Sequence, residues 1–207
     1  MRHLLPLAAL LSLAACDQVM TSTPDYRPQD AGSVDQAMCL LGFTAVPLTE
    51  LVTGHHLVGA TINGVAGIFV LDTGANASVV NTAAAGQFGL TPALGGLVPA
   101  IGIGVGGAQK AGFSTADSLV IGGVDIRRKR LMTANLDQVV KLLGPMAGGA
   151  QISGIIGQDV MKEHRAVIDV AKPILYLIAA DADSAPVEAS ACGGAADGAE
   201  TEAAPAR

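Results

Sequence analysis

The sequence predicts an all-β fold, and two observations favour it. The 207 residues include 26 glycines, and short apolar runs recur between them, as expected for short strands joined by tight turns. Only 3% of the residues are aromatic and tryptophan is absent from the sequence, so the core must be built from Val, Ile, Leu and Ala. Residues 44–180 are long enough for a single domain with one core.

The domain is expected to begin with a β-hairpin. Residues 57–62 and 65–71 are apolar runs joined by Asn63-Gly64, a dipeptide that is the strongest short hairpin signal. The end of the second run is continuously apolar, as in a strand buried on both faces. It leads straight into an acidic residue, a small hydroxyl residue and a glycine, which are Asp72, Thr73 and Gly74.

Shorter elements are predicted downstream of this hairpin. The Ala-rich stretch 81–87 favours a short helical turn after a strand at 79–80. The apolar runs 119–124 and 131–134 are predicted strands around a glycine turn. The basic run 127–130 between them is better interpreted as a solvated edge that opposes aggregation than as a contact with anionic lipid or an acidic substrate.

The last predicted elements are a helix and a second hairpin. Asp159 is the predicted N-cap of a helix that continues to Glu163. His164 follows in the same charged helix and is expected at the surface. The apolar runs 166–170 and 174–177 then close the domain as a hairpin.

Residues 102–107 formally match the G-x-G-x-x-G pattern of dinucleotide-binding sites. Such a site needs a helix after the last glycine, within a strand–helix–strand unit. Residues 108–113 instead contain a further glycine and lack a helical apolar stripe. The pattern therefore does not support a dinucleotide cofactor.

The D-T-G tripeptide and its context resemble the retropepsin-like aspartic proteases, the single-domain branch that includes the retroviral enzymes. The context is the apolar run before the aspartate and two sets of residues after it, namely Ala75 with Ser78, and the distant signature Ile155, Ile156 and Gly157. The resemblance covers about residues 57–178. It implies a retropepsin-like acid protease barrel with a short C-terminal helix.

The family's chemistry explains why these residue types are needed. Two carboxylates a few Å apart share one proton, so one activates a water and the other protonates the scissile carbonyl. The resemblance assigns the catalytic positions to Asp72, Thr73 and Gly74. The chain has one D-T-G, so the resemblance implies a homodimer with Asp72 from each subunit on the two-fold axis. In a chain active alone, Asp159 and Asp169 would be the first candidates for the second acid.

The resemblance also assigns supporting positions. In this family a glycine-tipped hairpin, the flap, closes over a polypeptide substrate. Here the flap would contain Gly104, Val105, Gly106 and Gly107, and Ala75 would also contact the substrate. Ser78, Ile155, Ile156 and Gly157 would support the catalytic loop. Retroviral members usually carry Arg where Gln158 stands, and that Arg pairs with acidic groups that stabilise the dimer.

Plainer interpretations of the same residues stay open at this point. Asp72 is also compatible with a simple strand-ending turn, since Asp and Gly are ordinary turn residues. Residues 102–107 fit a glycine-rich turn, and Ser78 fits a turn or cap position. The whole domain is also compatible with a non-catalytic lipoprotein that uses the fold to bind peptides or to assemble.

The chain ends lie outside the predicted domain. Residues 1–15 read as a short secretory signal, and its small residues before Cys16 resemble the bacterial lipoprotein lipobox. Cleavage before Cys16 and acylation would anchor the protein in the membrane, whereas an ordinary signal with a coincidental cysteine is the alternative. Residues 16–43 are predicted as a polar tether and residues 181–207 as an acidic, disordered tail.

These features place the expected protein in the bacterial cell envelope, facing the periplasm. Asp17 after the lipidation site resembles an inner-membrane retention signal, so the inner membrane is a possible location. Cys39 and Cys192 flank the domain and are compatible either with a disulfide or with two free thiols. No metal, cofactor or nucleic-acid partner is expected, because cysteine spacing, the adjacent His55-His56 pair and scarce aromatics do not support one.

The sequence therefore predicts a membrane-anchored aspartic endopeptidase that acts on polypeptide. Its overall charge of −6 says little about the substrate, since most of that charge lies in the tail.

Overall fold

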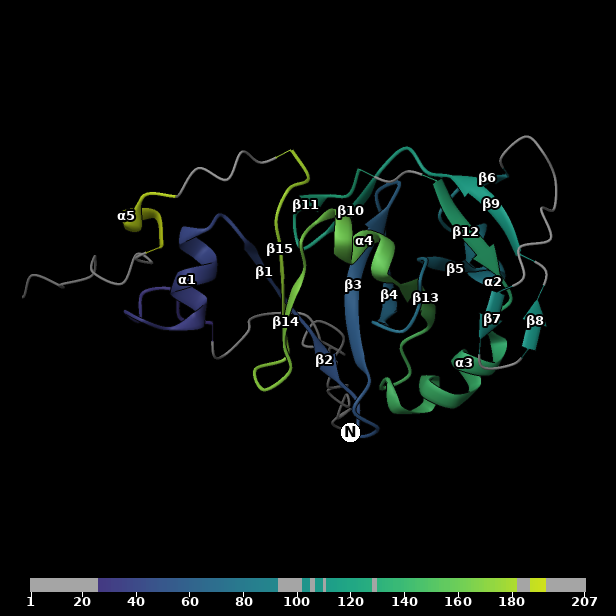
Figure 1. Ribbon diagram of the computed structural model, residues 1–207. Helices are drawn as coiled ribbons and strands as arrows, with labels where there is room; N and C mark the ends of the chain where they lie inside the picture. Colours follow the sequence, from purple (N-terminus) through teal and green to yellow (C-terminus); the bar gives the residue numbers. More distant parts are fainter. Residues whose placement is uncertain are drawn as a thin grey trace, which may run out of the picture.

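The computed structural model describes residues 26–92, 102–104, 107–109, 111–127, 130–181 and 187–192. Its main element is a ten-stranded sheet in the order β11-β10-β3-β4-β13-β5-β12-β9-β6, with β2 paired to β3 (Figure 1). The strands of this sheet are β2 (Thr49–Glu50), β3 (His56–Ile62), β4 (Val65–Leu71), β5 (Val79–Asn81), β6 (Thr91–Pro92), β9 (Ala111–Thr115), β10 (Leu119–Ile121), β11 (Val124–Asp125), β12 (Arg130–Ala134) and β13 (Ile152–Ile156).

Two smaller sheets and several short helices complete the described structure. One small sheet contains β1 (Thr44–Pro47), β15 (Ile174–Leu177) and β14 (Val167–Asp169), and the other contains β7 (Gly102–Gly104) and β8 (Gly107–Gln109). The helices are α1 (Val34–Leu40), α2 (Thr82–Ala85), α3 (Asp137–Leu143), α4 (Gln158–Glu163), α5 (Ala189–Cys192) and the 3-10 helix η1 (Gly144–Met146). Within the described ranges, every helix is too short or too polar to cross a membrane.

The predicted all-β fold is confirmed, and the first hairpin has its predicted register. β3 pairs with β4 from His56 opposite Leu71 to Ile62 opposite Val65. Asn63 and Gly64 at the turn have φ angles of 51° and 79°, and two positive values in succession are what a type I′ turn requires. This pairing fixes where β4 ends, and therefore where Asp72 leaves the sheet.

The strand β13 lies between β4 and β5. It runs parallel to β4, with Ile156 opposite Leu71, and antiparallel to β5, with Gly154 opposite Val80. The chain that connects β4 to β5 must therefore pass over the end of β13. Gly154 permits this close packing, since a Cβ there would clash with the Val79 carbonyl oxygen.

The core is aliphatic, as expected, with a small aromatic contribution. A large cluster joins residues from β3, β4, β10, β12, α4 and β15, and it includes Phe69 and Phe88, whose ring centroids are 6.1 Å apart. A smaller cluster of Leu51, Leu57, Val70, Leu143 and Ile152 lies under α3 and η1. Both clusters include residues of β3 and β4, so the end of β4, which leads into Asp72, is buried on both faces.

The segment from residue 26 to residue 43 is folded, which corrects the expectation of a polar tether over 16–43. It forms α1, which Figure 1 shows beside the small sheet of β1, β15 and β14. Leu175 and Leu177 of β15 enter the large core, while Tyr176 reaches the other way and donates a hydrogen bond to Asp35 of α1. Asp35 is completely buried, so α1 packs as part of the domain.

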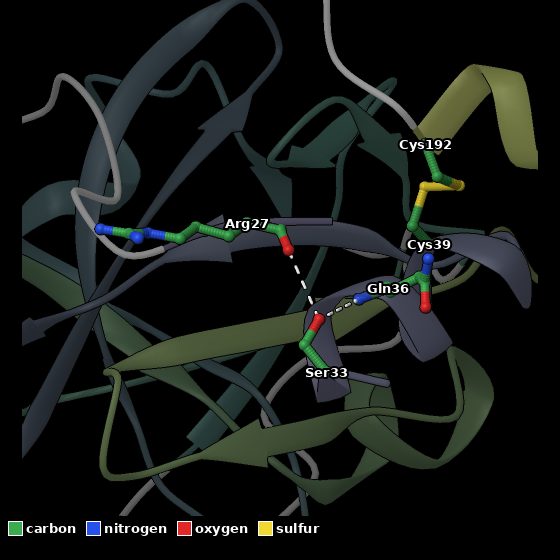
Figure 2. The surroundings of a disulfide bond; sticks show 5 residues. All are labelled: Arg27, Ser33, Gln36, Cys39 and Cys192. Atoms are coloured by element: carbon green, nitrogen blue, oxygen red, sulfur yellow. Dashed lines mark hydrogen bonds between the residues drawn. A yellow bond between two sulfur atoms is a disulfide. The ribbon is translucent and has the colours of Figure 1, made fainter. Parts of the chain in front are cut away.

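A disulfide between Cys39 and Cys192 joins α1 to α5 (Figure 2). The beginning of the expected acidic tail is therefore also ordered over residues 187–192, and the Val187 N–H donates to the Leu40 carbonyl oxygen. Ser33 caps α1 by accepting from the Gln36 N–H at 3.0 Å. The cysteines stand 153 positions apart, so composition alone could not pair them.

Three further expectations need correction. Gly157, not Asp159, is the N-cap of α4. His164 is completely buried, and its ring Nδ1 bonds to the Ile178 carbonyl oxygen just after β15. The run 119–124 is not one strand, since Gly122 and Gly123 both have positive φ and turn the chain between β10 and β11.

The basic run is described only at its ends. Arg127 lies next to the edge strand β11 and forms an exposed ion pair with Asp181 at 3.9 Å. Arg130 begins β12, which is an interior strand, and its guanidinium lies 4.0 Å from the centre of the Phe113 ring. Arg128 and Lys129 lie outside the described residues.

Candidate active site

Asp72 lies at the first position after β4, half-buried, beside the exposed residues Thr73 and Gly74. Its N–H donates to the Ile156 carbonyl oxygen at 3.0 Å. Its side-chain Oδ1 accepts from the Gly74 N–H at 2.8 Å. A Cβ on Gly74 would lie 3.2 Å from the same oxygen, so glycine keeps the space in front of the carboxylate open.

The distant signature passes directly behind this turn, as its resemblance implied. Ile155 and Ile156 pair with β4, and the Gln158 N–H then donates to the Ala75 carbonyl oxygen at 2.8 Å. A Cβ on Gly157 would lie 2.7 Å from the carbonyl carbon and oxygen of Ala77. Glycine is therefore needed at this position because the two segments touch backbone to backbone.

Ser78 ties the far end of the loop 72–78 to the start of α4. Its buried hydroxyl accepts from the Gly157 N–H at 2.9 Å and donates to Asp159 Oδ1 at 2.7 Å. The Ser78 N–H and the Val160 N–H donate to the same oxygen, each at 2.9 Å. The role of Asp159 was missed because its partner stands 81 positions away in the sequence.

The side chain of Gln158 makes a second contact that sequence reasoning missed. Its Nε2 donates to the Thr73 carbonyl oxygen at 2.6 Å. Gln158 thus bonds to the loop 72–78 on both sides of Gly74, through its side chain to Thr73 and through its N–H to Ala75. Retroviral members usually carry an Arg at this position, and that Arg stabilises the dimer. The glutamine of this chain instead makes a contact within its own chain.

Neither of the two alternative acids lies free beside Asp72. Asp159 Oδ1 is occupied by the donors from Ser78 and Val160. Asp169 Oδ1 accepts from the Ala171 and Lys172 N–H groups at 3.0 and 3.1 Å, in the turn between β14 and β15. The Asp159 carboxylate therefore joins the loop 72–78 to α4, and the Asp169 carboxylate holds the turn between β14 and β15. Over the residues described, one chain presents a single D-T-G carboxylate.

The remaining predicted site residues lie partly outside the described structure. β7 and β8 form an antiparallel hairpin with Gly104 opposite Gly107, while Val105 and Gly106 at its tip lie outside the described residues. Figure 1 places this hairpin beside the β12–β9 end of the large sheet. Cys16, the predicted lipidation site, also lies outside them.

Two surface hollows of the described residues lie on the β3–β4 side of the large sheet. A groove of about 400 Å³ lies over the β3–β4 hairpin, between Pro47 of β1 and Gly122, and a smaller hollow continues it toward Ala147. Asp72 lines neither of them. The described part of the chain also holds no group of three His, Cys, Asp or Glu side chains placed to bind a metal.

Comparison with known proteins identifies one family. The sequence matches the family model described as aspartyl protease over residues 58–160. No curated protein matches it. Among solved structures, it is similar to a retropepsin-like aspartic protease from Rickettsia conorii, with 21% identity, a TM-score of 0.43, and coverage of 66% of this chain and 90% of that one.

Two other solved structures are similar at the same level. One is EIAV protease complexed with the inhibitor HBY-793, with 20% identity, a TM-score of 0.38, and coverage of 56% of this chain and 92% of that one. The other is the retroviral protease-like domain of Ddi1 from Leishmania major, with 19% identity, a TM-score of 0.41, and coverage of 62% and 89%.

Proposed function

Because the chain belongs to the aspartyl protease family, we propose that it is a retropepsin-like member and that two copies form an endopeptidase with Asp72 of each copy at one active site. The observation that carries this proposal is the fixed Asp72 carboxylate. It is held at a strand end by the Gly74 N–H, while Thr73 and Gly74 beside it are exposed. An exposed rim around an oriented carboxylate is what a substrate needs to reach it.

The reaction needs two carboxylates in different protonation states. The ionised one takes a proton from a bound water, and that water attacks the scissile carbonyl carbon. The protonated one donates its proton to the carbonyl oxygen, so a tetrahedral intermediate forms without a covalent bond to the protein. Two carboxylates a few Å apart share one proton because both cannot ionise together.

A second copy is needed because each chain has one D-T-G aspartate, Asp72, and the reaction needs two carboxylates. Asp159 is bonded to Ser78 of the loop 72–78, and Asp169 is bonded within its own turn, so we assign the second carboxylate to neither of them. A two-fold axis beside the exposed Thr73 would bring two Asp72 side chains together and complete the site. A single copy would then supply only half of the cleft.

The proposed substrate is an extended polypeptide. The β7–β8 hairpin would close over it as the flap, and its glycines would let backbone N–H groups approach the peptide. Ala75, in the loop behind Gly74, would contact the substrate backbone from the opposite side. Gly104, Val105, Gly106 and Gly107 are the proposed flap positions.

We further propose that Cys16 is acylated and that the protein faces the periplasm from the membrane. The Cys39–Cys192 disulfide supports an oxidising compartment, since such bonds are rare in the cytosol. The test is detergent-phase partitioning of wild-type protein and of Cys16→Ser. Loss of partitioning in the variant is expected, and identical soluble behaviour of both forms would refute the anchor.

The catalytic proposal is tested by digesting a denatured protein or a peptide library between about pH 3 and about pH 7. Asp72→Asn should lower kcat at least about a thousandfold with an unchanged Tm, since the group removed acts in the chemical step. Pepstatin-type inhibitors should block the wild type. Cleavage that survives in Asp72→Asn would overturn the site, and peptide binding without any cleavage would favour the non-catalytic module.

Dimerisation is tested separately by mixing. Specific activity should rise with enzyme concentration and then saturate. Excess Asp72→Asn chain added to wild type should lower activity, because mixed dimers hold one acid. Full activity that is independent of concentration, from a strictly monomeric protein, would refute the two-copy site.

A further inference from the structure

The peptide unit between Thr73 and Gly74 is hydrogen-bonded at both of its polar ends. Its N–H, which belongs to Gly74, donates to Asp72 Oδ1 at 2.8 Å. Its carbonyl oxygen, which belongs to Thr73, accepts from Gln158 Nε2 at 2.6 Å. The side-chain amide and the carboxylate are therefore connected through one rigid peptide plane.

We infer that Gln158 is a positioning residue that acts on Asp72 through the Thr73–Gly74 peptide unit. The inference rests on the proposed function of Asp72. A hydrogen bond accepted by a peptide carbonyl polarises that peptide and strengthens the bond that its N–H donates. Gln158 thereby both fixes the orientation of the Gly74 N–H and increases its attraction for the ionised carboxylate.

The glutamine is itself held firmly enough to act in this way. Its N–H donates to the Ala75 carbonyl oxygen, so its backbone is attached to the loop. It is the first residue of α4, and the preceding Gly157 and the following Asp159 are both bonded to Ser78. The residue is half-buried, and its short bond of 2.6 Å to the Thr73 carbonyl oxygen fixes the direction of its side chain.

A glutamine at this position offers a donor whose strength does not change with pH. A glutamate of nearly the same shape would donate only when protonated, with a midpoint near pH 4.3 in the absence of other influences. A leucine would never donate. These two substitutions therefore separate the effect of the donated hydrogen bond from the effect of side-chain packing.

The experiment compares wild type, Gln158→Glu, Gln158→Leu and the control Gln36→Leu. Gln36 also bonds its side chain to a backbone group, since its Oε1 accepts from the Gly32 N–H at 2.8 Å, but it lies in α1. The kcat and KM values are measured at saturating enzyme concentration over about pH 3 to about pH 7, so that a change in association does not enter.

Gln158→Leu should lower kcat by about threefold to tenfold, the equivalent of one lost hydrogen bond, with KM little changed. The acidic limb of its pH–rate profile should move to higher pH, because the ionised carboxylate loses stabilisation. Gln158→Glu should approach wild-type kcat at the acidic end and fall to the leucine variant's kcat as pH rises. Gln36→Leu should match wild type throughout.

A second readout does not depend on proteolysis. The Gly74 amide proton should resonate upfield in Gln158→Leu relative to wild type, because its hydrogen bond is weaker. In Gln158→Glu its shift should move between the two values as the pH is raised. This NMR measurement tests the relay even if Asp72→Asn shows that the proposed function is wrong.

Two results would overturn the inference. One is a Gly74 resonance that is the same in all variants at every pH. The other is equal activity of the Glu and Leu variants across the pH range, which would make Gln158 a packing residue only.

Discussion

The loop 72–78 and the N-terminal latch are both attached to distant parts of the chain, but by opposite means. We define the N-terminal latch as residues 26–43 with α5, together with their contacts to β15. The latch is closed by a disulfide and a buried charge. The loop is held by backbone hydrogen bonds and by the side chains of Ser78, Asp159 and Gln158.

The buried charge of the latch is Asp35. Its carboxylate accepts from the Tyr176 hydroxyl at 2.5 Å, from Lys172 Nζ at 2.9 Å and from the Arg27 N–H at 2.7 Å. Burial by itself would raise the pKa of Asp35, but these hydrogen bonds outweigh burial and lower that pKa. Removing any one donor therefore leaves this buried carboxylate less well compensated.

The difference between the surroundings of Asp35 and of Asp72 follows from access to solvent and substrate. Nothing has to reach Asp35, so every side of it can be covered. Asp72 must stay open to water and to substrate, so its loop can be fixed only from behind, where β13 and α4 lie. The latch is thus expected to govern stability, and the loop to govern catalysis.

The largest expected effect is loss of the disulfide. Cys39→Ser combined with Cys192→Ser should lower the free energy of unfolding by about 2 to 5 kcal/mol, since the bond closes a long loop in the unfolded chain. Urea unfolding measures this change, and a reducing agent should reproduce it in wild type but have no effect on the double variant. Specific activity per folded molecule should not change. A parallel loss of activity would show that latch and loop are coupled.

Ser78→Ala should have a smaller effect on stability, about 1 to 3 kcal/mol, because the buried Gly157 N–H loses its acceptor. Unlike the disulfide change, it should also lower kcat, since the start of α4 is released from the loop. Ser78→Thr keeps the hydroxyl and is the matched control. If Ser78→Ala keeps full kcat, Ser78 is a folding residue and the division between the two regions is wrong.

The smallest expected effect is the pH dependence of the latch. The lowered pKa of Asp35 means that its stabilising contribution is complete above the ordinary value of 3.8 and is lost as pH falls through the folded-state pKa. Burial, together with the bond to Asp35 and its negative charge, raises the pKa of Tyr176 above its ordinary value of 10.0. The stabilising contribution of Tyr176 is therefore complete below pH 10.0 and is lost as pH rises through its folded-state pKa.

Tyr176→Phe tests the acidic and the alkaline decline in stability together. The alkaline decline in stability should disappear, and the acidic decline should shrink because Asp35 loses one of the bonds that lower its pKa. The expected loss at neutral pH is about 1 kcal/mol. Urea unfolding at a series of pH values measures the free energy of unfolding. If both declines are the same in the variant as in wild type, the pH dependence arises elsewhere.

Local pattern was sufficient for much of the fold. The Asn63-Gly64 turn, the buried strand before Asp72 and the final hairpin were predicted correctly because each signal lies within a few residues of the element that it specifies. His164 was placed wrongly for the same reason. Its neighbours in sequence are charged, while its burial depends on the distant segment at Ile178, just after β15.

By itself, the sequence determined the strands, the turns and the position of Asp72 in the chain, since periodicity and turn chemistry act over short distances. The tertiary structure decided which distant groups meet. Ser78 with Asp159, Gln158 with Thr73, Asp35 with Tyr176 and Cys39 with Cys192 are brought together only when the sheets assemble. Hydrogen bonds and disulfides depend on distance in space, and a polar or cysteine side chain carries no local signal of the partner that folding will bring to it.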